Sequence, residues 1–310
     1  MIKKHLVHLC LSAVCASALW GCGGSGDSLS TTTATTQDQT ITSNTSEEGS
    51  PDDQSVTSPF NSFDSLSSFT LSADGPNAGL SAYDLIENVF AAGSIEAPDM
   101  YPTDHTEGVH IVEDSDNMVG PHFVFLAHKV LDFNKGVESD RQRNQIKTYD
   151  KSPTALKGYQ GETMQFSWKF KISNELELSK KFSHFFQLKA KNFSQDNSKG
   201  FNADGTSTSD IYLIKADWSS VTDEWLNITV QATFAEEGAF YMQISRMQDN
   251  AILVDINEPV IDMWRGVSSE DFVRPKWGIY RSLADGDSLR SEEEQVRFAD
   301  FVVEKGTAAD

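Results

Sequence analysis

Residues 274–283 read RPKWGIYRSL, and this stretch shows most clearly which kind of fold the chain adopts. In a β-strand successive side chains point to opposite faces, because the side-chain period is two residues. Trp277 and Ile279 then share an apolar face, and Lys276 and Tyr280 lie on the opposite, polar face. The apolar face predicts packing against a core. The polar face, with an ammonium and a phenol, predicts a second role.

Gly278 separates the ammonium from the phenol on that polar face. Glycine weakens a strand, so an interior glycine often marks the close approach of a ligand or of another backbone. A β-bulge or a tight packing site is an equally good explanation. The sequence leaves both interpretations open.

Similar short segments, broken by Gly, Asn, Asp and Pro, recur through the rest of the chain, as in all-β domains. They predict a β-jelly-roll sandwich of two antiparallel sheets, concanavalin-like, with a concave face that forms a cleft. Short helical pieces are expected at residues 81–93 and 258–266. The expected strands are residues 122–133, 141–149, 162–172, 183–190, 210–216, 225–234, 239–247, 251–256, 275–283 and 296–305.

The N-terminus has the features of a secretion signal. Lys3 and Lys4 precede a short apolar run, which ends at the tetrapeptide LWGC. This pattern predicts a signal peptide over residues 1–21 and resembles a bacterial lipobox, with Cys22 as the lipidated residue. We expect an outer-membrane lipoprotein of the bacterial cell envelope, or a secreted protein. No cysteine follows Cys22, which excludes disulfides, thiol catalysis and cysteine-based metal sites in the mature chain.

Residues 22–75 are rich in Ser, Thr, Asp and Gln, and this composition predicts a disordered acidic tether. Residues 76–310 are then left as one folded domain, which we expect to be monomeric. The formal net charge of -21 argues against a nucleic-acid or anionic-membrane partner, apart from the lipid anchor. Residues 140–190 are the exception, because they hold ten Lys or Arg against five Asp or Glu. This local excess indicates an anionic ligand.

Several strand faces carry unusual polar side chains. Arg141, Arg143 and Gln145 alternate along one strand, and Gln187 and Lys189 along another. On the latter strand, strict alternation places His184, Phe186 and Leu188 on the face opposite Gln187. His128 alternates with apolar residues on a further strand. The alternatives are that the polar residues lie on an ordinary solvated surface, and that His128 is a histidine whose hydrogen bonds are satisfied within the fold.

Arginine, amide, lysine and tyrosine side chains on one sheet face suit β-elimination at a uronic acid. Cations and amides neutralise the carboxylate and stabilise the enolate-like intermediate. Tyr, Lys or His removes the C5 proton, and Tyr protonates the leaving oxygen. The reaction requires no metal or cofactor. Hydrolysis requires a pair of carboxylates instead, which these strands do not present. A structural calcium at residues 202–210 is an open alternative to a simple turn there.

The segments DRQRNQIKTYDKSP, GETMQFSWKFKI, FSHFFQLKA and RPKWGIYRSL resemble the β-jelly-roll polysaccharide lyases. The resemblance is to the glucuronan lyase, heparin lyase I and ulvan lyase group, and more distantly to alginate lyases. It covers residues 110–306, and it implies cleavage of an anionic, uronate-containing polysaccharide to unsaturated oligosaccharides.

The resemblance also implies roles for individual residues. Tyr280 corresponds to the catalytic acid, and also to a base, in a terminal Lys-x-Gly-x-Tyr motif. Lys189 stands where alginate lyases have a histidine, and His128 is a candidate base by likeness to glucuronan lyases. The other residues expected to bind substrate are Arg141, Arg143, Gln145, Gln187, His184, Lys276 and Arg281. Gln145 and Phe186 depart from the pattern, which favours the alternative of a non-catalytic surface lipoprotein that binds acidic glycans.

Overall fold

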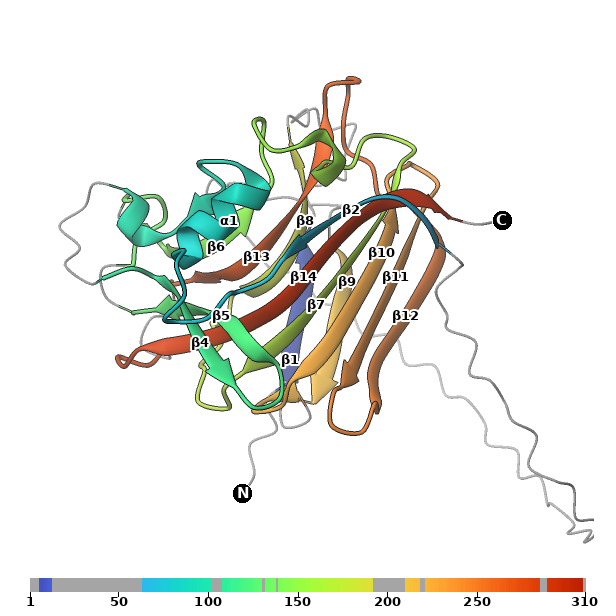
Figure 1. Ribbon diagram of the computed structural model, residues 1–310. Coiled ribbons are helices and arrows are strands. Elements are labelled where there is room, and N and C mark those ends of the chain that lie inside the picture. The colour runs from blue at the N-terminus through green and yellow to red at the C-terminus, as the bar shows by residue number, and fades with distance from the viewer. Residues whose placement is uncertain are drawn as a thin grey trace, which may run out of the picture. The chain divides into compact units, whose positions relative to one another are not determined.

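The computed structural model is a β-sandwich, with the described parts of the chain shown in Figure 1. The structure describes residues 6–12, 63–101, 108–129, 132–137, 139–191, 210–217, 221–284 and 289–308. Cys22, most of the predicted signal peptide and most of the predicted tether lie outside these residues. So does most of the loop 202–210. No helix within the described residues is both long and apolar enough to cross a membrane.

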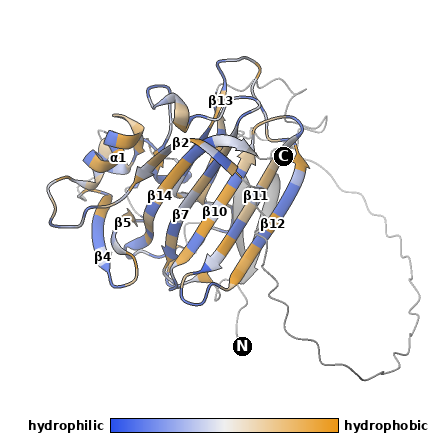
Figure 2. Cartoon of the chain, turned by 45° about the vertical axis from the view of Figure 1, so that its right-hand side comes forward, coloured by the Kyte–Doolittle hydropathy of each residue, from blue (hydrophilic) through white to orange (hydrophobic). Residues whose placement is uncertain are grey.

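The larger sheet has eight antiparallel strands. Its order is β12-β11-β10-β7-β14-β5-β4. The eighth strand, β2, pairs with the C-terminal part of β14, after the part that pairs with β5. The strands are β2 (Phe63–Leu71), β4 (Ile111–Asp116), β5 (Gly120–Ala127), β7 (Thr163–Ile172), β10 (Leu226–Thr233), β11 (Gly238–Arg246), β12 (Ile252–Ile261) and β14 (Glu294–Ala308). Bands of apolar and polar residues alternate along these strands in Figure 2, as a sheet with one buried face requires.

The smaller sheet has four antiparallel strands in the order β3-β6-β13-β8. These are β3 (Ile95–Glu96), β6 (Arg141–Lys147), β13 (Phe272–Ser282) and β8 (Ser183–Lys191). A separate pair joins β1 (Leu6–Ser12), within the predicted signal peptide, to β9 (Asp210–Asp217). There are also two short 3-10 helices among the described residues, η1 (Pro98–Met100) and η2 (Thr154–Leu156). The prediction of a jelly-roll sandwich built from two antiparallel sheets is confirmed.

Trp277 of β13 lies at the centre of the core between the two sheets and is fully buried. Its ring contacts Phe166 and Trp168 of β7, Phe186 of β8 and Phe301 of β14. An aromatic side chain of this size removes about 150–250 Å² from water, which stabilises the fold by roughly 4–6 kcal/mol. The apolar face of residues 274–283 therefore joins the two layers.

One helix, α1 (Ala82–Phe90), precedes the smaller sheet. Ser81 begins it with a capping box, in which the Ser81 hydroxyl accepts from the Asp84 backbone N–H and the Asp84 carboxylate accepts from the Ser81 N–H. Ala82, Ile86 and Phe90 recur at four-residue spacing and are buried, so one helical face packs on the sandwich. The Phe90 ring meets Trp277.

Three expectations about elements differ from the structure. Residues 258–266 are not helical, because β12 continues to Ile261 along β11. Pro259 is tolerated there because β12 is an edge strand and Pro removes only an unpaired donor. The expected strand 122–133 ends at Ala127. The folded part also begins before residue 76, because β2 pairs with β14. The serines of β2 resemble the composition of the tether, so composition did not reveal this strand.

Candidate active site

The smaller sheet gathers polar side chains on the face directed away from the core, here called the outer face. Its register places Tyr280 of β13 opposite Arg143 of β6, and Lys276 opposite Lys147. Gln145 lies between Arg143 and Lys147 on the same strand and is completely buried. These side chains share a face because each lies an even number of residues from the next.

Strand β8 contributes His184 to the outer face, contrary to the strict alternation expected from the sequence. Trp277 pairs with Phe186 but Tyr280 pairs with His184, so three residues of β13 are matched by two of β8. Phe185 and Phe186 both turn into the core, where they contact Phe170 and Trp168. This irregularity places His184 on the same face as Gln187, and the expectation that they lie on opposite faces was wrong.

Glu96 of β3 lies at the centre of the outer face and has four cationic partners. Its Oε2 lies 2.5 Å from Lys276 Nζ and 3.1 Å from Arg143 Nη1. Its Oε1 lies 2.9 Å from Lys147 Nζ and 3.1 Å from Lys135 Nζ. Burial alone would raise the pKa of the Glu96 carboxyl, but the four cations outweigh burial and hold that pKa well below its usual range. One carboxylate thus faces four cations, so the cluster keeps an excess of positive charge.

Tyr280 is buried, with 1% of its surface exposed, among cationic groups. The Arg141 Nη1–H donates to the Tyr280 hydroxyl at 3.0 Å, and the Arg143 guanidinium lies 3.9 Å from the ring centroid. The rings of Phe182 and His184 pack beside it. Two guanidiniums therefore lie where they would stabilise negative charge on the Tyr280 phenol.

A chain of hydrogen bonds links the two amides to His184. Gln145 Nε2 donates to Gln187 Oε1 at 3.3 Å, and Gln187 Nε2 donates to His184 Nδ1 at 2.9 Å. An amide nitrogen can only donate, so Nδ1 accepts and the proton of the neutral ring is on Nε2. Burial, followed by the charges of Arg143, Lys189 and Lys276, lowers the pKa of His184 to about 4. The ring is therefore neutral at pH 7 and offers an N–H donor.

Lys189 lies on the outer face but at a distance from Tyr280. It pairs with Arg274, whereas His184 pairs with Tyr280, five residues earlier on β8. At about 3.3 Å per residue this separation is roughly 16 Å along the strand. Lys189 and Tyr280 therefore share one face of the sheet, and His184 is the residue next to the phenol.

Two other predicted site residues lie on the opposite face of the smaller sheet. Arg281 has its Nε 2.7 Å from Gln142 Oε1, donates to the Glu177 carbonyl and lies 2.5 Å from Glu294. His128 lies near this face, because the Gln142 side-chain amide donates to the His128 backbone carbonyl. Gln142 leaves β6 on the face opposite Arg143, because the two residues are consecutive. The structure therefore does not bring His128 or Arg281 to Tyr280.

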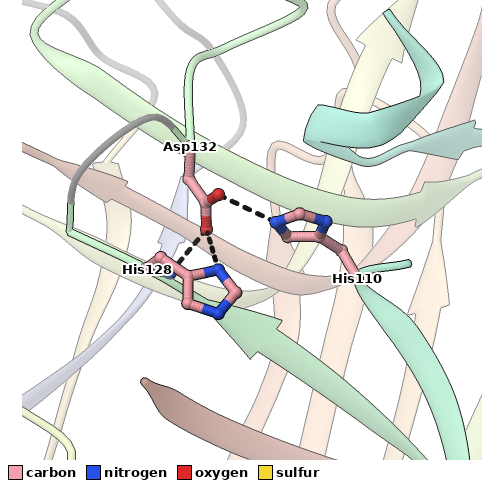
Figure 3. Close-up of side chains that lie close together, drawn as sticks. All are labelled: His110, His128 and Asp132. Carbon is pink, nitrogen blue, oxygen red and sulfur yellow. Dashed lines mark hydrogen bonds and ion pairs between the residues drawn. The ribbon is translucent and has the colours of Figure 1, made fainter. Parts of the chain in front are cut away.

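His128 instead belongs to a cluster with His110 and Asp132 (Figure 3). His110 Nε2 lies 2.8 Å from Asp132 Oδ1, and His128 Nδ1 lies 3.3 Å from Asp132 Oδ2. His110 Nδ1 lies 3.1 Å from Asp99 Oδ1. Burial would lower the pKa of His110, but hydrogen bonds and charges from Asp132 and Asp99 raise it to about 9. We call His110, His128 and Asp132 the inner cluster.

Gly278 approaches the backbone of β6 and not open space. A Cβ at this position would lie 2.2 Å from the Asn144 carbonyl oxygen, and φ is +130°. Both facts require glycine, because L residues with a side chain rarely adopt this conformation. Gly278 therefore packs tightly against the β6 backbone, at the register shift between β13 and β8, and does not leave room for a ligand.

The sequence reasoning missed Glu96, Asp132 and His110. Glu96 stands between Ile95 and Ala97, and all three are buried, so a lone carboxylate in a short apolar segment was the available signal. Nothing in the local sequence connects Glu96 with Lys276, 180 residues away. His110 and Asp132 lie outside any recognisable motif.

A scan against models of known protein families finds no match, and a search of curated proteins finds no similar sequence. Solved structures with a similar fold include an endo-β-1,4-glucuronan lyase from the fungus Trichoderma reesei, at 11% identity and a TM-score of 0.42, over 77% of this chain and 94% of that one. An alginate lyase from Aplysia kurodai is 9% identical with a TM-score of 0.44, over 76% and 97% of the two chains. A family 7 alginate lyase is 13% identical with a TM-score of 0.39, over 77% and 94%.

Proposed function

We propose that the protein is a polysaccharide lyase that cleaves an anionic, uronate-containing polysaccharide by β-elimination. The observation that carries the proposal is the grouping of Tyr280, Arg143 and His184 on one buried sheet face. The solved structures are 13% identical or less, so they show a similarity of fold alone, and the proposal rests on these side chains. Glucuronan and ulvan are the first substrates to test, followed by alginate and heparin.

The first requirement of elimination is neutralisation of the uronate carboxylate. The Nε2–H of neutral His184 and the guanidinium of Arg143 provide donors beside Tyr280. The Gln145–Gln187 chain orients the His184 ring and keeps its proton on Nε2. These donors stabilise the enolate-like intermediate that forms when C5 loses its proton.

The second requirement is proton transfer, which we assign to Tyr280. Tyr280 acts as the phenolate, whose charge Arg141 and Arg143 stabilise; its oxygen accepts the C5 proton and becomes the phenol. The phenol then gives that proton to the leaving glycosidic oxygen, which regenerates the phenolate. The C5–H and C4–O bonds break, and a C4–C5 double bond forms. The atoms and charges of this elimination balance without a metal, a cofactor or water.

Lys189 and Arg274 extend the cationic face beyond the reacting sugar. We assign these residues to neighbouring uronates of the polymer and not to proton transfer. Because Tyr280 is buried, substrate entry requires Phe182 and Arg141 to move from their positions beside the phenol. Both side chains are part-exposed, so this movement disrupts little of the core.

The test is ultraviolet absorbance of unsaturated product from each polysaccharide. We expect Tyr280→Phe to lower kcat by about 1,000-fold and His184→Gln by about 10- to 100-fold. Tyr241→Phe is the matched control, because Tyr241 is a buried tyrosine of β11 in the other sheet. Wild-type protein that binds these polymers and forms no unsaturated product would disprove the lyase assignment.

A non-catalytic module that binds acidic glycans is the second candidate. Glu96 favours it, because its carboxylate already occupies a position that a substrate carboxylate would take among Arg143 and Lys276. In that case polymer binding persists in Tyr280→Phe and product never forms. We further propose that the mature protein is a monomer, anchored at the bacterial cell envelope through lipidated Cys22. A Cys22→Ala variant would then be released in soluble form.

A further inference from the structure

The inner cluster gathers two imidazoles and a carboxylate on the core side of β6. Ligand atoms of His110, His128 and Asp132 all lie within 4.8 Å of one another. The two rings are nearly perpendicular, at 88°, with centroids 5.2 Å apart. As Figure 3 shows, one nitrogen of each ring is directed at the same Asp132 carboxylate. The three groups therefore converge on one small volume.

The other nitrogen of each ring faces a separate carboxylate. His110 Nδ1 lies 3.1 Å from Asp99, and His128 Nε2 lies 3.0 Å from Glu293. Histidines that bind a metal commonly hold their second nitrogen on an outer carboxylate, which fixes the tautomer and the ring orientation. Both histidines of the inner cluster have this arrangement.

Hydrogen bonds hold the outer carboxylate of Asp99 and the shared carboxylate of Asp132 in place. The Tyr83 hydroxyl donates to both oxygens of Asp99 at 2.8 Å. Gln142 Nε2 lies 3.3 Å from Asp132 Oδ2, and the backbone N–H of His128 donates to the same oxygen at 2.5 Å. The cluster is thus supported from both sides before any ligand arrives.

The spacing is close to that of a tetrahedral transition-metal site, with ligand atoms within 4.8 Å of one another. Bonds of about 2.0–2.1 Å place neighbouring ligand atoms of a tetrahedron roughly 3.3 Å apart. Asp132 Oδ1 lies 2.8 Å from His110 Nε2, and Asp132 Oδ2 lies 3.3 Å from His128 Nδ1. To bind one ion, His110 would move away from Asp132 by about half an ångström and one Asp132 oxygen would turn toward both rings; a fourth position remains for water or another ligand.

We propose that His110, His128 and Asp132 bind one divalent transition-metal ion of the zinc type. Three carboxylates, from Asp99, Asp132 and Glu293, surround the two imidazoles, so a divalent cation offsets an excess of negative charge. Imidazole ligands favour Zn²⁺ over the hard cation Ca²⁺, which prefers oxygen. The site lies on the face of β6 opposite Tyr280, so its role is structural and it is independent of the proposed lyase reaction.

The ion would join three segments that are distant in sequence. His110 immediately precedes β4, His128 follows β5, and Asp132 lies in the connection to β6. Three residues after Asp132, Lys135 reaches the outer face and pairs with Glu96. Metal binding would therefore fix the segment that supplies one of the four cations around Glu96.

The experiment uses purified wild-type protein, dialysed against a chelator and then titrated with Zn²⁺ by calorimetry and with Co²⁺ by visible absorption. We expect one ion per chain, a Co²⁺ spectrum typical of nitrogen–oxygen ligation and no heat with Ca²⁺. His128→Gln should weaken binding by more than about 100-fold, and Glu293→Gln, which alters only an outer carboxylate, by about 10-fold. His184→Gln, which removes a buried histidine on the outer face, should leave binding unchanged.

Circular dichroism shows whether each variant is folded, and Asp132→Asn provides a second ligand change if His128→Gln is not. The proposal is overturned if wild-type protein takes up neither ion. It is also overturned if uptake is equal in wild type, His128→Gln and Asp132→Asn, because the ion is then bound elsewhere. In either case His110, His128 and Asp132 form only an ion-paired network.

Discussion

The two faces of β6 carry buried polar clusters with opposite charge balance. On the outer face one carboxylate, Glu96, is surrounded by four cations. On the inner face two imidazoles are surrounded by three carboxylates. The backbone of one strand separates these clusters, because its consecutive side chains point in opposite directions.

The difference shows what each face is suited to bind. An excess of buried cations attracts an anion such as a uronate, and an excess of carboxylates attracts a metal cation. The outer face also has a phenol and an imidazole that can take part in proton transfer. The inner face has groups that hold the strands and their connections together. Four predictions test this division, from the largest expected effect to the smallest.

Glu96→Gln should have the largest effect on stability. It leaves Lys276 and Arg143 buried without their shared counter-ion, which costs about 3–5 kcal/mol of unfolding free energy. Urea denaturation measures the change. The matched control is Glu162→Gln, whose side chain is 35% exposed and pairs with Lys305, and which should cost less than about 1 kcal/mol. Equal losses in the two variants would show that the outer cluster is not a buried unit.

His184 should make the fold sensitive to acid. Its pKa is lowered to about 4 in the folded protein, against an ordinary value of 6.5, so the unfolded chain binds a proton first as the pH falls. This histidine therefore destabilises the fold progressively between about pH 6.5 and 4, by about 3 kcal/mol in total.

The measurement for His184 is the difference in unfolding free energy between wild type and His184→Gln across that pH range. Carboxylates titrate in both proteins, so they cancel in the difference. The wild type should lose more stability than the variant on acidification. Parallel curves would mean that His184 takes up its proton equally easily in the folded and unfolded chains.

Asn144→Ala tests the inner face of β6. The Asn144 amide donates to the carbonyls of His110 at 2.7 Å and Leu126 at 2.9 Å, and both bonds are lost. We expect a cost of about 2 kcal/mol, because two hydrogen bonds from one buried amide are lost, although the His110 carbonyl keeps its bond from the Leu126 N–H. Thermal unfolding measures it, with the exposed Asn174→Ala as control. A cost no greater than that of the control would mean that water replaces both bonds.

Lys135→Met should have the smallest effect. The Lys135 side chain is 49% exposed, and Glu96 keeps three other cations when it is removed. The expected loss of stability is below about 1 kcal/mol. A loss near that of Glu96→Gln would indicate that Lys135 contributes as a buried partner does.

Strand periodicity predicted much of the fold and part of the outer face. Alternation alone predicted that Arg143 and Gln145 share one face of β6 and that Lys276 and Tyr280 share one face of β13, and the pairing of these strands brings the four together. The register shift between β8 and β13 could not be predicted in this way, because Phe185 and Phe186 turn inwards together to contact rings on β7. That tertiary packing, and no local preference, brings His184 beside Tyr280.

By itself, the sequence determined an all-β sandwich with an apolar core and a cationic sheet face, since these follow from a two-residue period and from composition. Only the tertiary structure decided which charges meet. Glu96 reaches Lys276 across 180 positions of the chain, and His128 pairs with Asp132 and not with Tyr280. The physical reason is that strand order and register determine which distant side chains meet, and both are settled when the two sheets pack together.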